Sequence, residues 1–124
     1  MENQLKPEQI HGKKLVAVAG YEIFGKQLIT TVNKELEDKN LLLIGINIRD
    51  DDFDFFIRNL AKSKVETTIF LPEFQKRSAE FYGVEGYLIA VYKKDDKMKF
   101  LTDEQEIFMD DTNLIRVIKT VEGV

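Results

Sequence analysis

The spacing of apolar residues changes several times along the chain, and each change predicts a new secondary-structure element. The run Leu15–Ala19 is apolar at every position and lies between Gly12 and Gly20, which is typical of a buried strand. From residue 25 to about residue 39 the apolar positions follow helical spacing, so we expect an amphipathic helix that ends at Asn40. Its apolar stripe consists of Leu28, Ile29, Val32 and Leu36.

A second strand and a second helix come next. Leu41–Ile48 is apolar without alternation, which is the pattern of a central strand covered on both faces. An acidic run follows, and we expect Asp51 or Asp52 to cap the helix after it. The apolar stripe of that helix consists of Phe53, Phe56, Ile57 and Leu60.

The third strand is shorter than the first two. Thr67–Leu71 has the composition of a strand, and Pro72 closes it. Phe74–Phe81 predicts a short helix, and Gly83 ends that part of the chain.

Beyond Gly83 the pattern changes to two strands in succession. Tyr87–Tyr92 and Met98–Leu101 flank a polar stretch of hairpin-turn type. The final helix runs from Asp111 to about Val121 and takes Asp111 or Thr112 as its cap.

The predicted order of elements is β-α-β-α-β-(α)-β-β-α, which places the chain in the α/β class. Right-handed crossovers make the first three strands parallel, with helices on both faces of one sheet. The hairpin then adds an antiparallel edge, so the sheet is mixed.

The chain length and the absence of repeats indicate a single domain. The 124 residues suffice for one core, and we assign residues 12–124 to it and residues 1–11 to an N-terminal extension. The chain contains no cysteine. This excludes disulfides, thiolate catalysis, cysteine-ligated zinc and iron–sulfur clusters together.

Charge and hydropathy narrow the classes of partner. Lys plus Arg total 18 and Asp plus Glu total 22, giving a net charge of −4 with the two signs interspersed. A nucleic-acid-binding face needs a basic stripe, which we do not find, and no apolar run is long enough to span a membrane. The N-terminus lacks the apolar core of a secretory signal. We therefore expect a soluble protein, cytoplasmic as given, or extracytoplasmic if a signal peptide has been removed.

Metal and cofactor sites are not expected. His11 is the only histidine, which argues against a histidine-based zinc site. The acidic run Asp50–Asp52 with Asp54 lacks the glycine and the distant glutamate of a calcium-binding loop, so we assign it to helix capping and solvation.

Four stretches of the sequence resemble motifs of one family. They are Gly12–Val16 (GKKLV), Gly45–Asp50 (GINIRD), Ala79–Tyr87 (AEFYGVEGY) and Val91–Lys97 (VYKKDDK). In this order and spacing they resemble the thioredoxin-like superfamily, in its redoxin and membrane-anchored branch. The resemblance implies a thioredoxin-like three-layer sandwich with a central mixed sheet.

The departures from that family concern its active site. Where the family carries a W-C-x-x-C-K element, this chain has Tyr21 for the tryptophan, Glu22 and Gly25 for the two cysteines, and Lys26 for the basic residue. Leu88 stands where the family has its cis-proline. Neither a carboxylate nor a glycine replaces a thiolate, so the chain is not a thiol-disulfide oxidoreductase or a peroxiredoxin.

These departures lead to a functional hypothesis with two alternatives. We expect a catalytically silent thioredoxin-like domain that binds a protein or peptide in the former active-site groove. The candidate groove consists of Tyr21, Glu22, Phe24, Gly25, Lys26, Glu85, Gly86, Tyr87 and Leu88. The first alternative is a non-thiol enzyme or small-ligand binder that uses Glu22 and Lys26, although Glu22 also suits a helix start as a simple charge. The second is an accessory subunit or self-associating module whose former active site has no role. Phe55, off the buried stripe of its helix, is a candidate partner contact. The oligomeric state stays open.

One rival fold shares the first half of the predicted order. A flavodoxin-like doubly wound sheet also begins with alternating strands and helices. It needs a further parallel strand and helix where the pattern shows a hairpin, and no phosphate-cradling glycine-rich loop is evident after the LVAVA run.

Overall fold

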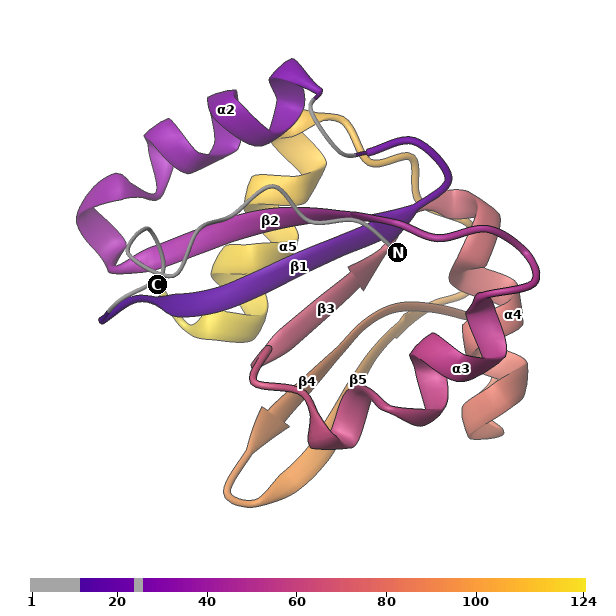
Figure 1. Ribbon diagram of the computed structural model, residues 1–124. Coiled ribbons are helices and arrows are strands. Elements are labelled where there is room, and N and C mark those ends of the chain that lie inside the picture. The colour runs from indigo at the N-terminus through magenta and orange to yellow at the C-terminus, as the bar shows by residue number, and fades with distance from the viewer. Residues whose placement is uncertain (1–11, 24–25) are drawn as a thin grey trace.

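The structure is a computed structural model that describes residues 12–23 and 26–124 (Figure 1). Its strands are β1 (Lys14–Gly20), β2 (Leu41–Asn47), β3 (Thr67–Phe70), β4 (Tyr87–Lys94) and β5 (Lys97–Asp103). Its α-helices are α2 (Gln27–Glu35), α3 (Phe53–Arg58), α4 (Pro72–Tyr82) and α5 (Asp111–Glu122). Short 3-10 turns, at 37–39 and 60–62, follow α2 and α3. The predicted extension 1–11, with His11, lies outside the described residues.

The five strands form one mixed sheet in the order β2-β1-β3-β4-β5. β1 is parallel to both β2 and β3, while β4 is antiparallel to β3 and β5 is antiparallel to β4. The predicted α/β class, mixed sheet and antiparallel hairpin are therefore confirmed. The order 2-1-3-4-5 is that of flavodoxin-like doubly wound sheets, although the last two strands here are an antiparallel pair.

Helices cover both faces of the sheet, giving three layers (Figure 1). α2 and α5 pack on one face through Ile29, Val32, Leu36, Leu114, Val117 and Ile118. α3 and α4 pack on the other through Phe53, Phe56, Ile57, Leu60, Phe74 and Ala79. β1 serves both cores, because Val16 and Val18 face one and Ala19 faces the other. Both predicted helix stripes thus lie in the core.

Some helices begin or end at the residues that the sequence predicts, and others begin at a neighbouring residue. Asn40 and Gly83 adopt left-handed backbone at the ends of their helices, as the sequence indicates. α4 begins at Pro72, two residues earlier than predicted, because proline suits the first helical position. The cap of α5 is Asp110 rather than Asp111 or Thr112, since the Asp110 carboxylate accepts from the Asn113 N–H at 2.8 Å.

The C-terminal end of α5 is tied to the amino end of the sheet. The Glu122 carboxylate lies 2.9 Å from the Lys14 Nζ and accepts from the Thr67 hydroxyl at 2.7 Å. The Glu122 side chain is nearly buried, and the hydrogen bond that Lys14 makes with it raises the pKa of Lys14. This contact holds α5 across β1 and β3, so its opposite end reaches the carboxyl ends of these strands.

Two structural features are absent from the described part of the chain. None of its helices has the length and apolar character needed to cross a membrane. Nor does it bring three or more His, Cys, Asp or Glu side chains into an arrangement that would hold a metal ion.

Candidate functional site

A pocket of about 800 Å³ opens at the carboxyl ends of β1 and β3. After β1 the chain passes through α2 on one face of the sheet, and after β3 it passes through α4 on the other face. Such a reversal is a topological switch point, and open α/β sheets bind ligands in the crevice outside it. The pocket is lined by Tyr21, Glu22, Ile23, Lys26, Leu28, Thr31, Leu71, Pro72, Glu73, Phe108, Met109, Asp110 and Asp111.

The floor of this switch-point pocket is apolar and close-packed. Ile23, Leu71 and Met109 belong to the core shared by α2 and α5, and all three are buried. Gly20 beneath them has no room for a side chain, since an added Cβ would lie 2.1 Å from the Leu71 Cδ1. The glycine therefore allows Leu71 to close the floor.

Three residues of the predicted groove line the pocket. Tyr21, Glu22 and Lys26 follow β1 directly, and each contributes to its wall. Phe24 and Gly25 lie outside the described residues. Whether these side chains bind a ligand stays a prediction.

The other half of the predicted groove lies elsewhere. Residues 85–88 precede or begin β4, and none of them lines the pocket. β3 lies between β1 and β4 and separates them by two strand spacings, roughly 10 Å. Leu88 is completely buried, and the Tyr87 ring lies under the Lys76 ammonium group. The sheet order thus divides the predicted groove into two separate places.

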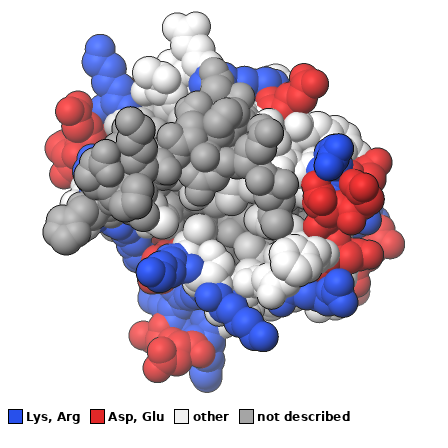
Figure 2. Space-filling model, viewed as in Figure 1, with Lys and Arg blue, Asp and Glu red and all other residues white. Residues whose placement is uncertain are grey.

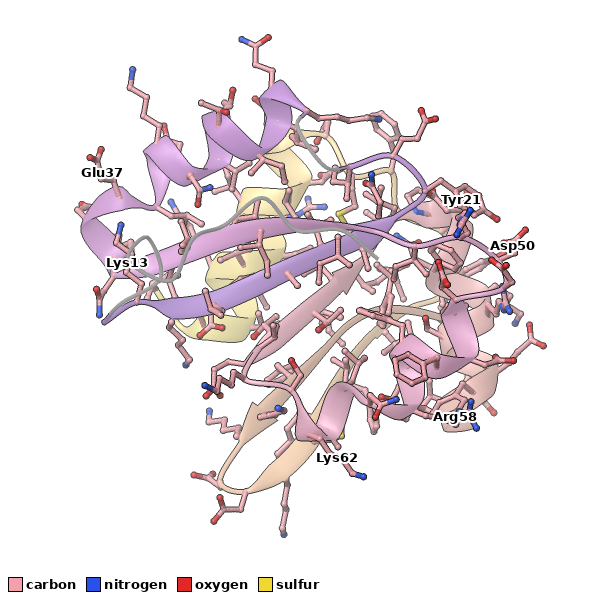
Figure 3. The ribbon with its side chains drawn as sticks, in the orientation of Figure 1. Lys13, Tyr21, Glu37, Asp50, Arg58 and Lys62 are labelled. Carbon is pink, nitrogen blue, oxygen red and sulfur yellow. The ribbon has the colours of Figure 1, made fainter. Side chains whose placement is uncertain are left out.

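Tyr21 is held at the rim by contacts from two segments, and Figure 3 shows it beside Asp50 of the first of them. Its hydroxyl donates to the Asp50 Oδ1 at 2.5 Å, and its ring lies edge-on to Phe74 with centroids 5.0 Å apart. Arg77 of α4 completes the group, donating to the Asp50 carbonyl at 3.0 Å and lying over the Phe53 ring. Tyr21 is therefore oriented by the β2–α3 loop and by α4, and its hydroxyl acts as a donor.

The contact between Tyr21 and Asp50 predicts how the Tyr21 hydroxyl titrates with pH. The hydrogen bond to Asp50 raises the pKa of Tyr21 above its ordinary value of 10.0. A raised folded-state pKa means that the stabilisation is complete below the unfolded pKa and is lost as the pH rises through the folded one. We expect the phenolate absorbance that disappears in Tyr21→Phe to titrate at higher pH than free tyrosine. In Asp50→Asn the same component should move to lower pH; an unchanged position would contradict the assignment.

A buried amide that the sequence reasoning missed holds the far wall of the pocket. Gln75 of α4 is completely buried, and its side chain donates to the carbonyls of Phe70 and Ile107 at 2.9 and 2.8 Å. Its amide oxygen accepts from the Ile107 N–H at 2.9 Å. These bonds fix the loop that carries Phe108 and Met109. A glutamine beside the apolar stripe of a helix was the available signal.

The β1–α2 loop carries a glycine spacing that the sequence reasoning also passed over. Gly20–Gln27 reads G-x-x-x-x-G-K-Q, the spacing of a phosphate-binding P-loop that ends in Gln instead of Ser or Thr. Phosphate would need free backbone N–H groups here. The Tyr21 N–H donates to the Glu73 Oε2 and the Ile23 N–H to the Asn47 Oδ1, both at 2.9 Å. Side-chain oxygens of the protein thus take up two of these donors.

The charges around the pocket are unequal. Among the described residues that line it, four carry a carboxylate, Glu22, Glu73, Asp110 and Asp111, and one, Lys26, carries a positive charge. Figure 2 shows further acidic side chains gathered on the edge of the molecule where Figure 3 places Tyr21 and Asp50. The pocket is therefore an acidic environment with an apolar floor.

Comparison with known proteins bears on the fold. A scan against protein-family models finds no match for the sequence, and a search of curated proteins finds none either. Solved structures do match. A shikimate dehydrogenase from Peptoclostridium difficile has a TM-score of 0.58 at 7% identity, covering 90% of this chain and 42% of that one. This chain therefore shares its fold with part of that structure.

Two further solved structures match the fold of this chain. A Listeria monocytogenes shikimate 5-dehydrogenase, solved with shikimate and NAD, has a TM-score of 0.52 at 11% identity, covering 98% of this chain and 42% of that one. A 5-ketofructose reductase from Gluconobacter has a TM-score of 0.51 at 10% identity, with 88% and 40% covered. This chain thus spans about two fifths of the length of each structure.

The thioredoxin-like interpretation is therefore wrong, and so is the expectation of a catalytically silent module of that superfamily. The matching structures are dehydrogenases and a reductase. The motifs that suggested thioredoxin have local causes in this structure. Gly83 ends α4 with left-handed backbone, and Asp95 and Asp96 form a two-residue hairpin turn with positive φ. Such signals mark turns in many α/β folds.

Proposed function

We propose that this chain is a small-molecule-binding domain of Rossmann-like fold, related to the dehydrogenase type, and that its ligand binds in the switch-point pocket. The observation that carries the proposal is the position of the pocket, at the carboxyl ends of β1 and β3 where the chain reverses its direction across the sheet. The volume, about 800 Å³, is within the range of ligand sites.

The construction of the pocket also supports a binding role. Its floor is formed by buried apolar side chains, and its rim carries oriented polar groups such as the Tyr21 hydroxyl. Small-molecule sites combine an apolar lining with a few fixed polar groups in this way. The Gln75 hydrogen bonds keep the far wall in place, so the pocket is preformed.

The residues present do not fit a nicotinamide dinucleotide. A dinucleotide places its pyrophosphate on free N–H groups after a G-x-G-x-x-G loop. In this chain Tyr21 and Glu22 follow Gly20, and the N–H groups of Tyr21 and Ile23 are already bonded. The surrounding carboxylates would repel the phosphates as well. The Listeria structure was solved with shikimate, which is not a nucleotide, and with NAD, which is a dinucleotide. We assign to this chain a site for a ligand that is not a nucleotide.

The test is a fragment library, with shikimate and NAD⁺ included, screened by amide chemical shifts on the wild type and on Thr31→Trp. Thr31 is exposed at the pocket wall, so the indole should fill the space, and we expect hits near Tyr21, Leu71 and Met109 to lose binding by about tenfold or more. Thr30→Trp is the matched control, because Thr30 is exposed on the same helix but does not line the pocket.

Two outcomes would overturn the proposal. The first is that no fragment shifts the pocket residues. The second is that Thr31→Trp and Thr30→Trp affect the hits equally. Saturable NAD⁺ binding abolished by Thr31→Trp would contradict the assignment to a non-nucleotide ligand.

A further inference from the structure

We infer that the ligand of the switch-point pocket is an organic cation, an ammonium group attached to an apolar body. The inference rests on the proposed function and adds the chemical class of the ligand. Three observations support it: the negative charge of the pocket, the two exposed aromatic side chains that line it, and its apolar floor.

The pocket keeps a net negative charge after its positive groups are set against its carboxylates. Three helix N-termini meet there, those of α2, α4 and α5, and each carries roughly half a positive charge. Together with Lys26 they offset part of the four carboxylates, and a net charge of roughly −1.5 remains. A cationic ligand compensates this charge, whereas an anionic ligand adds to it.

The carboxylates keep oxygens available for a ligand. One Asp110 oxygen caps α5, and one Glu73 oxygen accepts from the Tyr21 N–H. Each carboxylate has a second oxygen, for which no bond is recorded among the described residues. Glu22 is exposed at the pocket wall, so its carboxylate is open to a ligand. An ammonium group has three donors and suits such a rim.

Two aromatic side chains of the described residues line the pocket. Phe108 is 71% exposed and Tyr21 is 44% exposed, although both belong to a pocket wall. The large exposure of Phe108 has no explanation in the packing of the chain. Cations attached to carbon are attracted to the faces of such rings. The buried floor of Ile23, Leu71 and Met109 then suits an apolar body on the same molecule.

Three probes with one phenyl group separate the charge of the ligand from its apolar body. We expect 2-phenylethylamine to bind in the pocket about tenfold more tightly than 2-phenylethanol, and 3-phenylpropionate to bind more weakly than either. Binding is followed by amide chemical shifts on the wild type, with Thr31→Trp to confirm the place. The preference for the amine should decrease as salt is added.

A charge-neutralising pair tests the residues. In Glu22→Gln/Asp111→Asn we expect the amine to bind about fivefold more weakly while the alcohol is unaffected. The Asp110 cap stays intact in this variant. The matched control is Glu37→Gln/Asp38→Asn, which removes the same charge from exposed residues that do not line the pocket. Figure 3 shows Glu37 at the opposite end of the molecule from Tyr21.

The outcomes separate this inference from the proposed function. If the alcohol or the carboxylate binds in the pocket as tightly as the amine, the pocket is a ligand site and the inference of a cation is wrong. Equal weakening in the two charge variants also contradicts the inference, because it would show a long-range effect of net charge. If none of the three probes and no library fragment binds, the proposed function falls as well.

Discussion

Gly86→Ala should destabilise the protein by about 3 kcal/mol, because the new side chain meets both backbone strain and a steric clash. Gly86 has a φ of +78°, in the left-handed region that favours glycine. A Cβ at this position would lie 2.4 Å from the Asp103 carbonyl oxygen, in the strand paired with β4. The free energy of unfolding from urea denaturation measures the effect.

Gly83→Ala is the control for this substitution. Gly83 also has positive φ, at +70°, but an added Cβ would meet nothing within 4 Å. The strain alone should then lower the free energy of unfolding by about 1 kcal/mol. Equal effects at the two glycines would show that the clash with Asp103 does not exist. The comparison also bears on the sequence interpretation, which placed Gly86 in a binding groove, whereas the structure explains it through the backbone.

Gln75→Leu should lower the free energy of unfolding by about 3 kcal/mol, since it leaves buried backbone groups of Phe70 and Ile107 without partners. The loop that carries Phe108 and Met109 would lose its main attachment to α4. We therefore expect faster amide hydrogen exchange across residues 104–109 and weaker binding of every ligand of the switch-point pocket.

Gln105→Leu is the matched control for Gln75→Leu. Gln105 belongs to the same loop but is exposed, and the one hydrogen bond it makes within the described part of the chain runs from its backbone N–H to Asp103. Its substitution should change the free energy of unfolding by less than about 0.5 kcal/mol. Wild-type hydrogen exchange in Gln75→Leu would contradict the role given to this amide.

The predictions from sequence succeeded where the signal is local. Helical spacing predicted the buried stripes of α2 and α3, and Asn40 and Gly83 marked the ends of helices because left-handed backbone favours these residue types. The cap of α5 was misplaced by one residue, since Asp110 and Asp111 are equally suitable by type.

The candidate site was predicted only in part. Tyr21, Glu22 and Lys26 were selected through the resemblance to a W-C-x-x-C-K element, and they line the pocket because they directly follow the first strand, where α/β folds bind ligands. Leu71, Phe108 and Met109 could not be selected, since they are far from Tyr21 in sequence and meet it only in the folded chain. The role of Gln75 could not be predicted for the same reason, because its hydrogen-bond partner Ile107 is 32 residues away in the sequence.

The sequence by itself determined the elements of this protein, their order, their apolar faces and the antiparallel hairpin. The tertiary structure alone decided on which side of β1 the third strand lies. Right-handed crossovers allow β3 to follow β2 outward or to return past β1, depending on which face of the sheet takes the intervening helix. Here α3 packs opposite α2, and β3 lies between β1 and β4. Hydrophobic periodicity shows which face of a helix is buried but not which face of the sheet buries it, so the position of the pocket follows from packing over the whole chain.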